Sequence, residues 1–483
     1  MAVSLTTELP TELFIGGKWR EASDGERFDV IDPATEGVIA NIASASEGDA
    51  LDAVAAANDA FGFWARTPPR ERAEILRAAF ELMIERRDDI ATTIVRENGK
   101  PLSEAFSEVT YAAEFFRWFS EEAVRNRGIL MRAPSGRNRI MVSHEPVGVS
   151  VLITPWNFPA AMATRKIAPA LAAGCTVILK PASESPLTSL LIGRLMEEVG
   201  LPLGVVNVLP AKRSGVVVSR ILEDSRVRKL SFTGSTEVGR ILLEQAAKRI
   251  VDCSMELGGN APFIVFDDAD LETAVKGALL AKLRNCGEAC TAANRFYVQA
   301  GIADRFANAL TKAFNEVKVG PGLDEEVSLG PLINDHARRD IDELISDAVE
   351  RGAKVLTGGK ARGGRGFFYP ATVLDRVQEG STILKHEIFG PVAPIVRFSD
   401  EEDAIHLANN TVHGLVAYIY TSDLARGLRV SERVEFGMVG LNRGIVSDPA
   451  APFGGVKESG IGREGSYEGM LAFTETKYIA TDW

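Results

Sequence analysis

Residues 230–239 read Leu230-Ser231-Phe232-Thr233-Gly234-Ser235-Thr236-Glu237-Val238-Gly239. This run predicts a β-strand that enters a Gly-Ser turn and continues as a helix. The free N–H groups at the start of such a helix suit a pyrophosphate, although Gly-Ser-Thr before a helix is by itself only a capping sequence. The chain has no Gly-x-Gly-x-x-Gly motif between a strand and a helix. The run therefore indicates an α/β fold whose turn is compatible with a nucleotide.

Strand-like segments alternate with helical segments on both sides of this turn. β-Favouring residues concentrate at 149–154, 175–179, 205–209 and 228–232, and a second such series extends from 262 to about 440. Strands that are joined by helices pair in parallel. With 483 residues, the chain is also too long for a single hydrophobic core. The sequence predicts an α/β protein with two parallel sheets.

The first 148 residues follow a different pattern. We expect short strands within 12–45, a helix that begins at Ser46 with Asp49 in the capping-box position, and two long helices near 69–97 and 101–126. The aromatic residues at 115–119 fit core packing. Residues 139–144 favour a strand and lack a helical period, so 129–148 are predicted to form an extended ribbon.

Composition limits the kinds of partner. The formal net charge of -12 argues against a nucleic-acid surface, and no apolar run approaches the length of a membrane span. The start, Met1-Ala2-Val3-Ser4-Leu5, lacks the basic and apolar regions of a secretory signal. The cysteines at 175, 253, 286 and 290 form neither a CxxC pair nor a zinc spacing. We expect a cytoplasmic protein with no metal site, no membrane anchor and no nucleic-acid partner.

The run Lys282-Leu283-Arg284-Asn285-Cys286-Gly287-Glu288-Ala289-Cys290-Thr291 suggests the chemistry. It places the thiol of Cys290 among small and polar residues, where a substrate can approach. Glu256 lies 34 residues upstream between apolar neighbours, where a surface carboxylate is unexpected. A thiolate nucleophile needs a base for its proton, and hydrolysis of a thioester needs a base for water. Burial would raise the pKa of Glu256 toward a useful range.

Asn157 is a third candidate. It lies in Ile153-Thr154-Pro155-Trp156-Asn157-Phe158-Pro159, directly after a predicted strand. The two prolines restrict the loop, so the side-chain amide could be fixed in space. An Asn in a loop is otherwise a common turn residue.

These motifs together resemble the aldehyde dehydrogenase superfamily almost end to end, and most of all its NAD(P)-dependent succinate-semialdehyde dehydrogenases. The resemblance implies two Rossmann-type parallel-sheet domains plus a β oligomerisation ribbon. It implies that residues 1–128 and 149–255 form a cofactor-binding domain and that 256–448 form a catalytic domain. Residues 129–148 and 466–483 would then form the oligomerisation element of a homodimer or homotetramer.

The resemblance implies catalytic roles for Cys290, Glu256 and Asn157. Cys290 would attack the aldehyde carbon to form a thiohemiacetal, which becomes a thioester when hydride leaves to a nicotinamide. Asn157 and the N–H of Cys290 would form an oxyanion hole. Glu256 would activate the hydrolytic water, which argues against transfer of the acyl group to coenzyme A. The chain departs from the family pattern Asn-x-Gly-Gln-x-Cys because Glu288 stands in place of Gln.

The resemblance also implies a cofactor site. Lys180 would hydrogen-bond the adenosine ribose, and Glu387 would hold the nicotinamide ribose. Many NAD-preferring relatives carry Glu at the position of Ser183, where a carboxylate would repel a 2′-phosphate. We therefore expect NADP, with NAD as the alternative because Glu184 is adjacent. The other residues implied to contact the cofactor are Ile153, Pro155, Trp156, Gly234, Ser235, Gly239, Leu257 and Phe389.

Arg165, Arg284 and Ser447 match the positions that bind the distal carboxylate in succinate-semialdehyde dehydrogenases. Arginine pairs bidentately with carboxylates, although either arginine alone could be a solvated surface charge. The expected substrate is succinate semialdehyde. The alternatives are glutarate semialdehyde or another ω-oxo acid, an uncharged aldehyde, and a catalytically silent protein on the same scaffold.

Three departures bear on these expectations. Arg443 and the pair Asp448-Pro449 are unusual near the substrate mouth and leave the chain length of the substrate open. Ala292 stands where relatives often carry a second cysteine that forms a redox-switch disulfide. Cys286 would be a substitute partner for Cys290 only if the loop bends.

Overall fold

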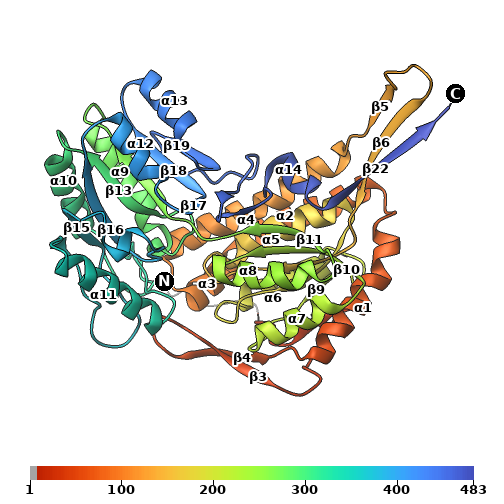
Figure 1. Cartoon of the computed structure of the whole chain (residues 1–483). Coiled ribbons are helices and arrows are strands. Elements are labelled where there is room, and N and C mark those ends of the chain that lie inside the picture. Colours follow the sequence, from red (N-terminus) through yellow and green to blue (C-terminus); the bar gives the residue numbers. More distant parts are fainter. Residues whose placement is uncertain (1–7, 483) are drawn as a thin grey trace.

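The computed structural model describes residues 8–482, so residues 1–7, which include the start considered as a signal sequence, and residue 483 lie outside the described part. Figure 1 shows two α/β bodies beside each other and a narrow ribbon that projects from one of them. This arrangement confirms the predicted fold class, with two mainly parallel sheets and a separate β-ribbon.

The first sheet has eight strands in the order β2-β1-β9-β8-β7-β10-β11-β21. Its central strands β9, β8, β7, β10 and β11 are parallel, and the outer strands pair antiparallel. The predicted segments from 149 to 232 supply four of the central strands. The bounds are β1 Leu13–Ile15, β2 Lys18–Arg20, β7 Val149–Ile153, β8 Thr176–Lys180, β9 Val206–Val208, β10 Val227–Thr233, β11 Asp252–Glu256 and β21 Gly460–Ile461.

The second sheet has seven strands in the order β14-β15-β16-β13-β12-β18-β19. Only β14 pairs antiparallel, at one edge. An aromatic cluster around the fully buried Phe263 forms part of its core, with Phe296, Phe306, Tyr418 and Tyr420. The bounds are β12 Ala261–Val265, β13 Ala293–Gln299, β14 Lys354–Thr357, β15 Thr372–Asp375, β16 Val392–Phe398, β18 Val416–Tyr420 and β19 Met438–Leu441.

Helices cover both sheets. Those associated with the first sheet are α1 Glu47–Trp64, α2 Pro69–Glu85, α3 Arg87–Asn98, α4 Leu102–Glu122, η1 Ala123–Arg125, α5 Pro159–Ala173, α6 Leu187–Glu198, α7 Ser214–Glu223, α8 Thr236–Ala247 and α14 Ser466–Leu471. Those associated with the second sheet are α9 Leu271–Leu283, η2 Arg284–Gly287, α10 Ala303–Asn315, α11 Asp335–Glu350, η3 Thr382–Leu384, α12 Glu401–Asn409 and α13 Leu424–Arg433. None of the helices within residues 8–482 combines the length and the apolar character that crossing a membrane requires.

The third sheet is the projecting ribbon. The predicted extended segment contains β5 (Ile129–Arg132) and β6 (Arg139–Pro146), and β22 (Thr474–Thr481) pairs with β6 along eight residues. Figure 1 shows this sheet extending away from the body of the chain. Two small antiparallel pairs complete the strands, β3 Arg27–Ile31 with β4 Val38–Ala43, and β17 His413–Gly414 with β20 Val456–Lys457.

The N-terminal helices agree with the sequence in part. Ser46 and Asp49 form the predicted capping box at the start of α1. The prediction of one helix over 69–97 was wrong, because the backbone leaves the helical region at Arg86 and a second helix begins at Arg87. The acidic residues that follow suit the first turn of a new helix, which was the signal that the sequence offered. α3 ends at Gly99, whose φ of 93° is left-handed.

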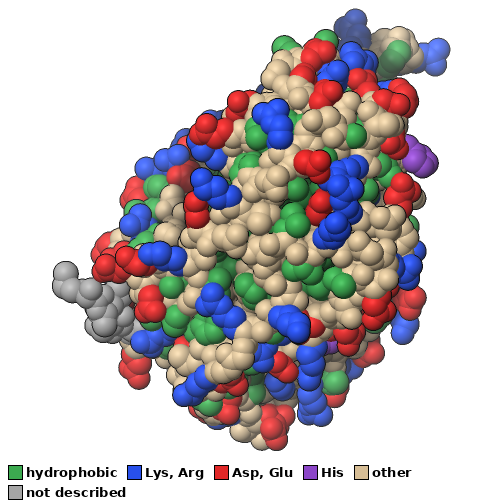
Figure 2. All heavy atoms as spheres, turned by 90° about the vertical axis from the view of Figure 1, so that its left-hand side faces the viewer, with side chains coloured by type: hydrophobic (Ala, Val, Ile, Leu, Met, Phe, Trp, Pro, Cys, Tyr) green, Lys and Arg blue, Asp and Glu red, His purple; other side chains and the backbone are tan. Residues whose placement is uncertain are grey.

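Figure 2 shows the face that lies at the left of Figure 1, where α10 and α11 are located. Acidic and basic side chains are interspersed with apolar ones across it. The charge on this face is therefore mixed rather than gathered into a patch of one sign.

Candidate active site

The predicted site residues converge because the carboxyl ends of neighbouring parallel strands lie on the same side of the first sheet. Ile153 at the end of β7 pairs with Lys180 at the end of β8, and Thr233 of β10 pairs with Glu256 of β11. The loops that leave these ends carry further predicted residues, namely Asn157, Ser183, Gly234 and Ser235.

Cys290 lies in the loop between η2 and β13. Asn285, Cys286 and Gly287 have φ values of 52°, 56° and 76°, a left-handed run that non-glycine residues rarely adopt. The chain therefore turns sharply just before Cys290. A Cβ at Gly259 would overlap the carbonyl oxygen of Cys290, so only glycine permits this approach. The loop that carries Cys290 thus contacts the turn that connects the two sheets.

Cys290 lines two cavities. The first, of about 610 Å³, contains Arg165, Arg284 and Ser447, and we call it the arginine cavity. The second, of about 540 Å³, lies against the Gly-Ser turn and is called the turn cavity. Cys290 is the one residue within residues 8–482 that lines both cavities, so groups bound in each could meet at this residue.

The turn cavity contains the predicted cofactor residues except Gly239: Ile153, Pro155, Trp156, Lys180, Ser183, Gly234, Ser235, Leu257, Glu387 and Phe389. Gly239 lies in α8, where a Cβ would overlap the Leu257 side chain. It therefore lets Leu257 approach the helix. Ser214 and Gly215, at the start of α7, also line the cavity and were not predicted.

Asn157 is held by the loop that carries Cys290. Its Nδ2 donates to the carbonyl oxygen of Glu288 at 2.9 Å, and its own carbonyl oxygen accepts from Lys100 and Asn285. The buried Oδ1 has no partner among the described residues. Asn157 lines the turn cavity together with Cys290, so its amide is fixed on the wall of the cavity that Cys290 also lines.

Glu256 ends β11 and is buried. It lines neither cavity within residues 8–482, and its Oε2 is buried without a hydrogen bond. Burial and the nearby Glu464 raise the pKa of Glu256 well above its ordinary value, while Lys166 and Arg165 act in the opposite direction. A raised pKa makes the ionised carboxylate a stronger base than an exposed one, as a general base requires.

The pKa of the Cys290 thiol is raised to about 12. Burial is the largest cause, followed by the negative charge of Glu387, while Arg165 and Arg284 act to lower it. Burial also raises the pKa of Glu387 to about 7. Before any ligand binds, the thiol is therefore the dominant form at neutral pH.

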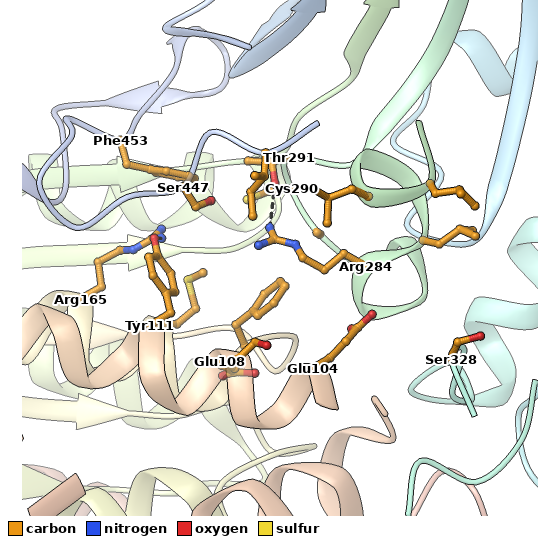
Figure 3. A pocket seen from close by; sticks show the side chains of 18 of the residues that line it. Glu104, Glu108, Tyr111, Arg165, Arg284, Cys290, Thr291, Ser328, Ser447 and Phe453 are labelled. Atoms are coloured by element: carbon orange, nitrogen blue, oxygen red, sulfur yellow. Dashed lines mark hydrogen bonds between the residues drawn. The ribbon is translucent and has the colours of Figure 1, made fainter. Parts of the chain in front are cut away.

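Figure 3 shows how the arginine cavity is arranged. Arg165 extends from α5 and Arg284 from η2, and Ser447 lies between their guanidinium groups in this view. Arg284 donates to the Thr291 hydroxyl at 3.4 Å and lies over the Phe158 ring at 5.1 Å. The three predicted residues are thus brought together on the cavity wall.

Sequence reasoning missed several residues of this region. Lys166 Nζ lies 2.5 Å from Glu464 and 2.9 Å from Ser231 Oγ, all buried beneath Glu256. Tyr111, from α4, lines the arginine cavity and hydrogen-bonds Arg165. Lys166 directly follows a predicted residue, but no local pattern distinguishes Glu464 or Tyr111.

The cysteines are free in the described structure. Cys286 is buried and its thiol donates to the carbonyl oxygen of Gly330 at 3.0 Å. Burial, with Glu288 beside it, raises the pKa of Cys286 well above its ordinary value. This thiol is therefore protonated and engaged elsewhere, whereas Cys290 faces the cavities.

The sequence matches the aldehyde dehydrogenase family over residues 19–479. The chain therefore belongs to the aldehyde dehydrogenase family, a family of NAD(P)-dependent oxidoreductases. The family predicted from the sequence is confirmed.

Several relatives are similar over nearly their whole length. A succinate-semialdehyde dehydrogenase of Paenarthrobacter nicotinovorans is 54% identical over 92% of this chain and 98% of its own. The NADP(+) succinate-semialdehyde dehydrogenase of Escherichia coli is 48% identical, and a glutarate-semialdehyde dehydrogenase of Pseudomonas putida is 47% identical, each over 97% of both chains. The crystal structure of an E. coli NADP-dependent enzyme superposes with a TM-score of 0.97 at 48% identity, covering 98% of both chains.

The raised pKa of Cys290 predicts its reactivity toward iodoacetamide. Because only the thiolate reacts and its pKa is about 12, the alkylation rate of the ligand-free protein should rise about tenfold per pH unit between roughly pH 7 and 9. Peptide mass spectrometry would follow this residue separately from the other cysteines.

The Glu387→Gln variant tests the cause of the shift. Loss of the neighbouring negative charge should lower the pKa of Cys290 and speed its alkylation at every pH in this range. A rate that does not depend on pH would contradict the assigned protonation state.

Proposed function

We propose that this chain oxidises succinate semialdehyde to succinate with NAD(P)+. The observation that supports it most is the position of Cys290, which lines both a cavity with two arginines and a cavity of the kind that binds a nucleotide. The names of the most similar relatives given above point to the same substrate.

Cys290 is the proposed nucleophile. Its thiol loses its proton to solvent, the sulfur forms a bond to the aldehyde carbon, and the electron pair of the C=O π bond moves to the oxygen, which becomes the oxyanion of a thiohemiacetal. The Nδ2 of Asn157 and the backbone N–H of Cys290 stabilise that oxyanion, because N–H donors act most strongly where charge develops. Asn157 suits this task since its amide is already fixed by the Glu288 carbonyl.

The turn cavity fits NAD(P)+. The N–H groups at the start of α8 suit the pyrophosphate, and Lys180 and Glu387 are available for the two riboses. Gly258 leaves room between the connecting turn and the Glu387 carboxylate, since a Cβ there would lie 3.0 Å from Oε2. When bound, the cofactor supplies the hydride acceptor that converts the thiohemiacetal to the thioester.

Glu256 is the proposed base for thioester hydrolysis. It takes a proton from water, and the hydroxide adds to the acyl carbon and releases succinate from the Cys290 sulfur. A raised pKa makes this carboxylate a stronger base than an exposed one.

Arg165, Arg284 and Ser447 are proposed to bind the distal carboxylate of the substrate. A desolvated carboxylate between two guanidinium groups is strongly favoured, and the hydroxyl of Ser447 adds a neutral donor. The three groups lie on the same cavity as the sulfur. The aldehyde carbon is thereby directed toward Cys290.

Glutarate semialdehyde is the second candidate substrate. The arginine cavity extends past the arginines to Lys276 and Ser328, which leaves space for a longer chain. Relatives named for this substrate are 46–47% identical to the chain. A panel of semialdehydes of increasing length distinguishes the two substrates.

The cofactor-binding domain, catalytic domain and oligomerisation element are proposed with the bounds given from the sequence. The ribbon carries exposed apolar side chains on β5 and β22, namely Ile129, Leu130, Met131, Tyr478 and Ile479. An apolar, projecting sheet of this kind gains free energy when a second copy covers it. We propose that it joins the subunits of a homodimer or homotetramer.

Glu256→Gln should form the thioester but hydrolyse it slowly, because an amide cannot take a proton from water. Stopped-flow absorbance should record a rapid burst of reduced cofactor followed by a slow steady state. Glu272→Gln, on an exposed helix face, is the control. Steady-state turnover of Glu256→Gln at the wild-type rate would disprove the role as base.

Ser183→Glu should shift the preference from NADP toward NAD. The new carboxylate would face the 2′-phosphate, and like charges at close range cost on the order of 1 kcal/mol or more. The measurement is the ratio of kcat/KM with the two cofactors. An unchanged ratio would place Ser183 away from the 2′ position.

The Arg284→Ala variant tests whether the substrate carries a distal carboxylate. Removing one partner of a desolvated charge pair costs roughly 2–5 kcal/mol, so kcat/KM for succinate semialdehyde should fall by about one and a half to three and a half orders of magnitude, while butanal is affected much less. Arg339→Ala, an exposed arginine, is the control. Equal losses on both substrates would leave an aldehyde dehydrogenase whose substrate is not an ω-oxo acid.

A further inference from the structure

Arg165 is enclosed on most sides. Its side chain is 2% exposed, and its guanidinium carbon lies 4.2 Å from the ring centre of Phe453 and 5.2 Å from that of Phe115. The carboxylate of Glu464 lies 3.6 Å from Nη1, and this carboxylate is shared with Lys166. The positive charge of Arg165 is therefore already partly balanced before a substrate enters the cavity.

Tyr111 is the polar group that completes this enclosure. Its oxygen accepts a hydrogen bond from Nη2 of Arg165 at 2.5 Å. Its ring meets that of Phe115 edge to face, at 5.0 Å and 68°, so the side chain is held by packing as well as by the arginine. Figure 3 shows the Tyr111 hydroxyl beside the Arg165 guanidinium on the wall of the arginine cavity.

The hydroxyl proton of Tyr111 is not used within the described chain. Within residues 8–482, the Tyr111 hydroxyl makes one hydrogen bond, in which its oxygen accepts from Arg165. A hydroxyl that accepts one hydrogen bond still has its own proton to donate. Since Tyr111 lines the cavity that ends at Cys290, that proton can be given to a group bound there.

We propose that Tyr111 determines specificity for ω-oxo acids by donating its hydroxyl proton to the distal carboxylate while it holds Arg165 in place. One carboxylate oxygen pairs with the Arg165 guanidinium, and the other accepts from Tyr111. This inference rests on the proposed function and adds a donor to it. A neutral donor is effective here because Glu464 already offsets much of the charge on Arg165, and hydrogen bonds to a carboxylate are among the stronger ones.

The test is Tyr111→Phe, which removes only the hydroxyl and keeps the ring contacts with Phe115 and Arg165. For succinate semialdehyde, kcat/KM should fall roughly 10- to 100-fold. The loss should appear in KM, because the carboxylate is bound equally in the ground and transition states. The kinetics with butanal, which lacks the carboxylate, should stay within about twofold of wild type. Tyr467→Phe, a half-buried tyrosine that lines neither cavity, is the matched control.

A binding measurement separates this role from a purely structural one. Product inhibition by succinate should weaken in Tyr111→Phe by about the same factor as KM rises. Tyr111→His, which restores an N–H donor on an aromatic ring, should recover part of the affinity. This second variant also keeps the test valid if the phenylalanine protein proves unstable.

The outcomes distinguish this inference from the proposed function. A wild-type enzyme that does not prefer succinate semialdehyde over butanal would overturn both. A wild-type preference that Tyr111→Phe retains, with unchanged inhibition by succinate, would overturn the role of Tyr111 alone. Equal losses on both aldehydes would also overturn it, because the hydroxyl would then only support the cavity wall.

Discussion

The contact between Gly259 and the carbonyl oxygen of Cys290 is the constraint on which the site depends. The chain crosses from β11 to β12, and so from one sheet to the other, through this turn. The N–H of Gly259 also donates to Glu387 at 3.2 Å, so a single glycine contacts both the loop that carries Cys290 and the loop that carries Glu387. Any side chain here would push these segments apart. Because the turn begins directly after Glu256, the proposed base and the sulfur are positioned by the same few residues.

The electrostatic balance of the site follows from burial. Glu256, Glu464, Lys166 and Arg165 lie together with little exposure to solvent, where unpaired charge is costly. The short contact between Lys166 and Glu464 pairs two of these charges, and burial beside Glu464 raises the pKa of Glu256. The same burial that makes Cys290 a thiol before ligands bind would strengthen every later interaction with a bound anion. The arginines are thus most effective toward a substrate that brings its own negative charge.

The sequence predicted the parts of this protein that local patterns encode. The strands of both sheets follow β-favouring runs, and the capping box at Ser46 fixed the start of α1. The break at Arg86 was missed because apolar residues occur at helical spacing on both sides of the charged run 85–89, in which the first helix ends. Cys290 and Glu256 lie in recognisable motifs, so their meeting could be expected from the resemblance. Tyr111 and Glu464 could not be found in this way, because they join the site only through packing between α4, α5 and the loop that precedes α14.

The position of Cys290 between two cavities also bears on the order in which substrate, cofactor and products bind and leave. Apart from Cys290, the two cavities have no lining residue in common within residues 8–482, so a ligand in one leaves the other free. In the proposed reaction, reduced cofactor can therefore depart while an acyl group is still attached to Cys290, and the room that it leaves is available to water. Turnover then depends on the separate release of two products, one from each cavity. Substitutions in one cavity can therefore change the release rate of one product without changing that of the other.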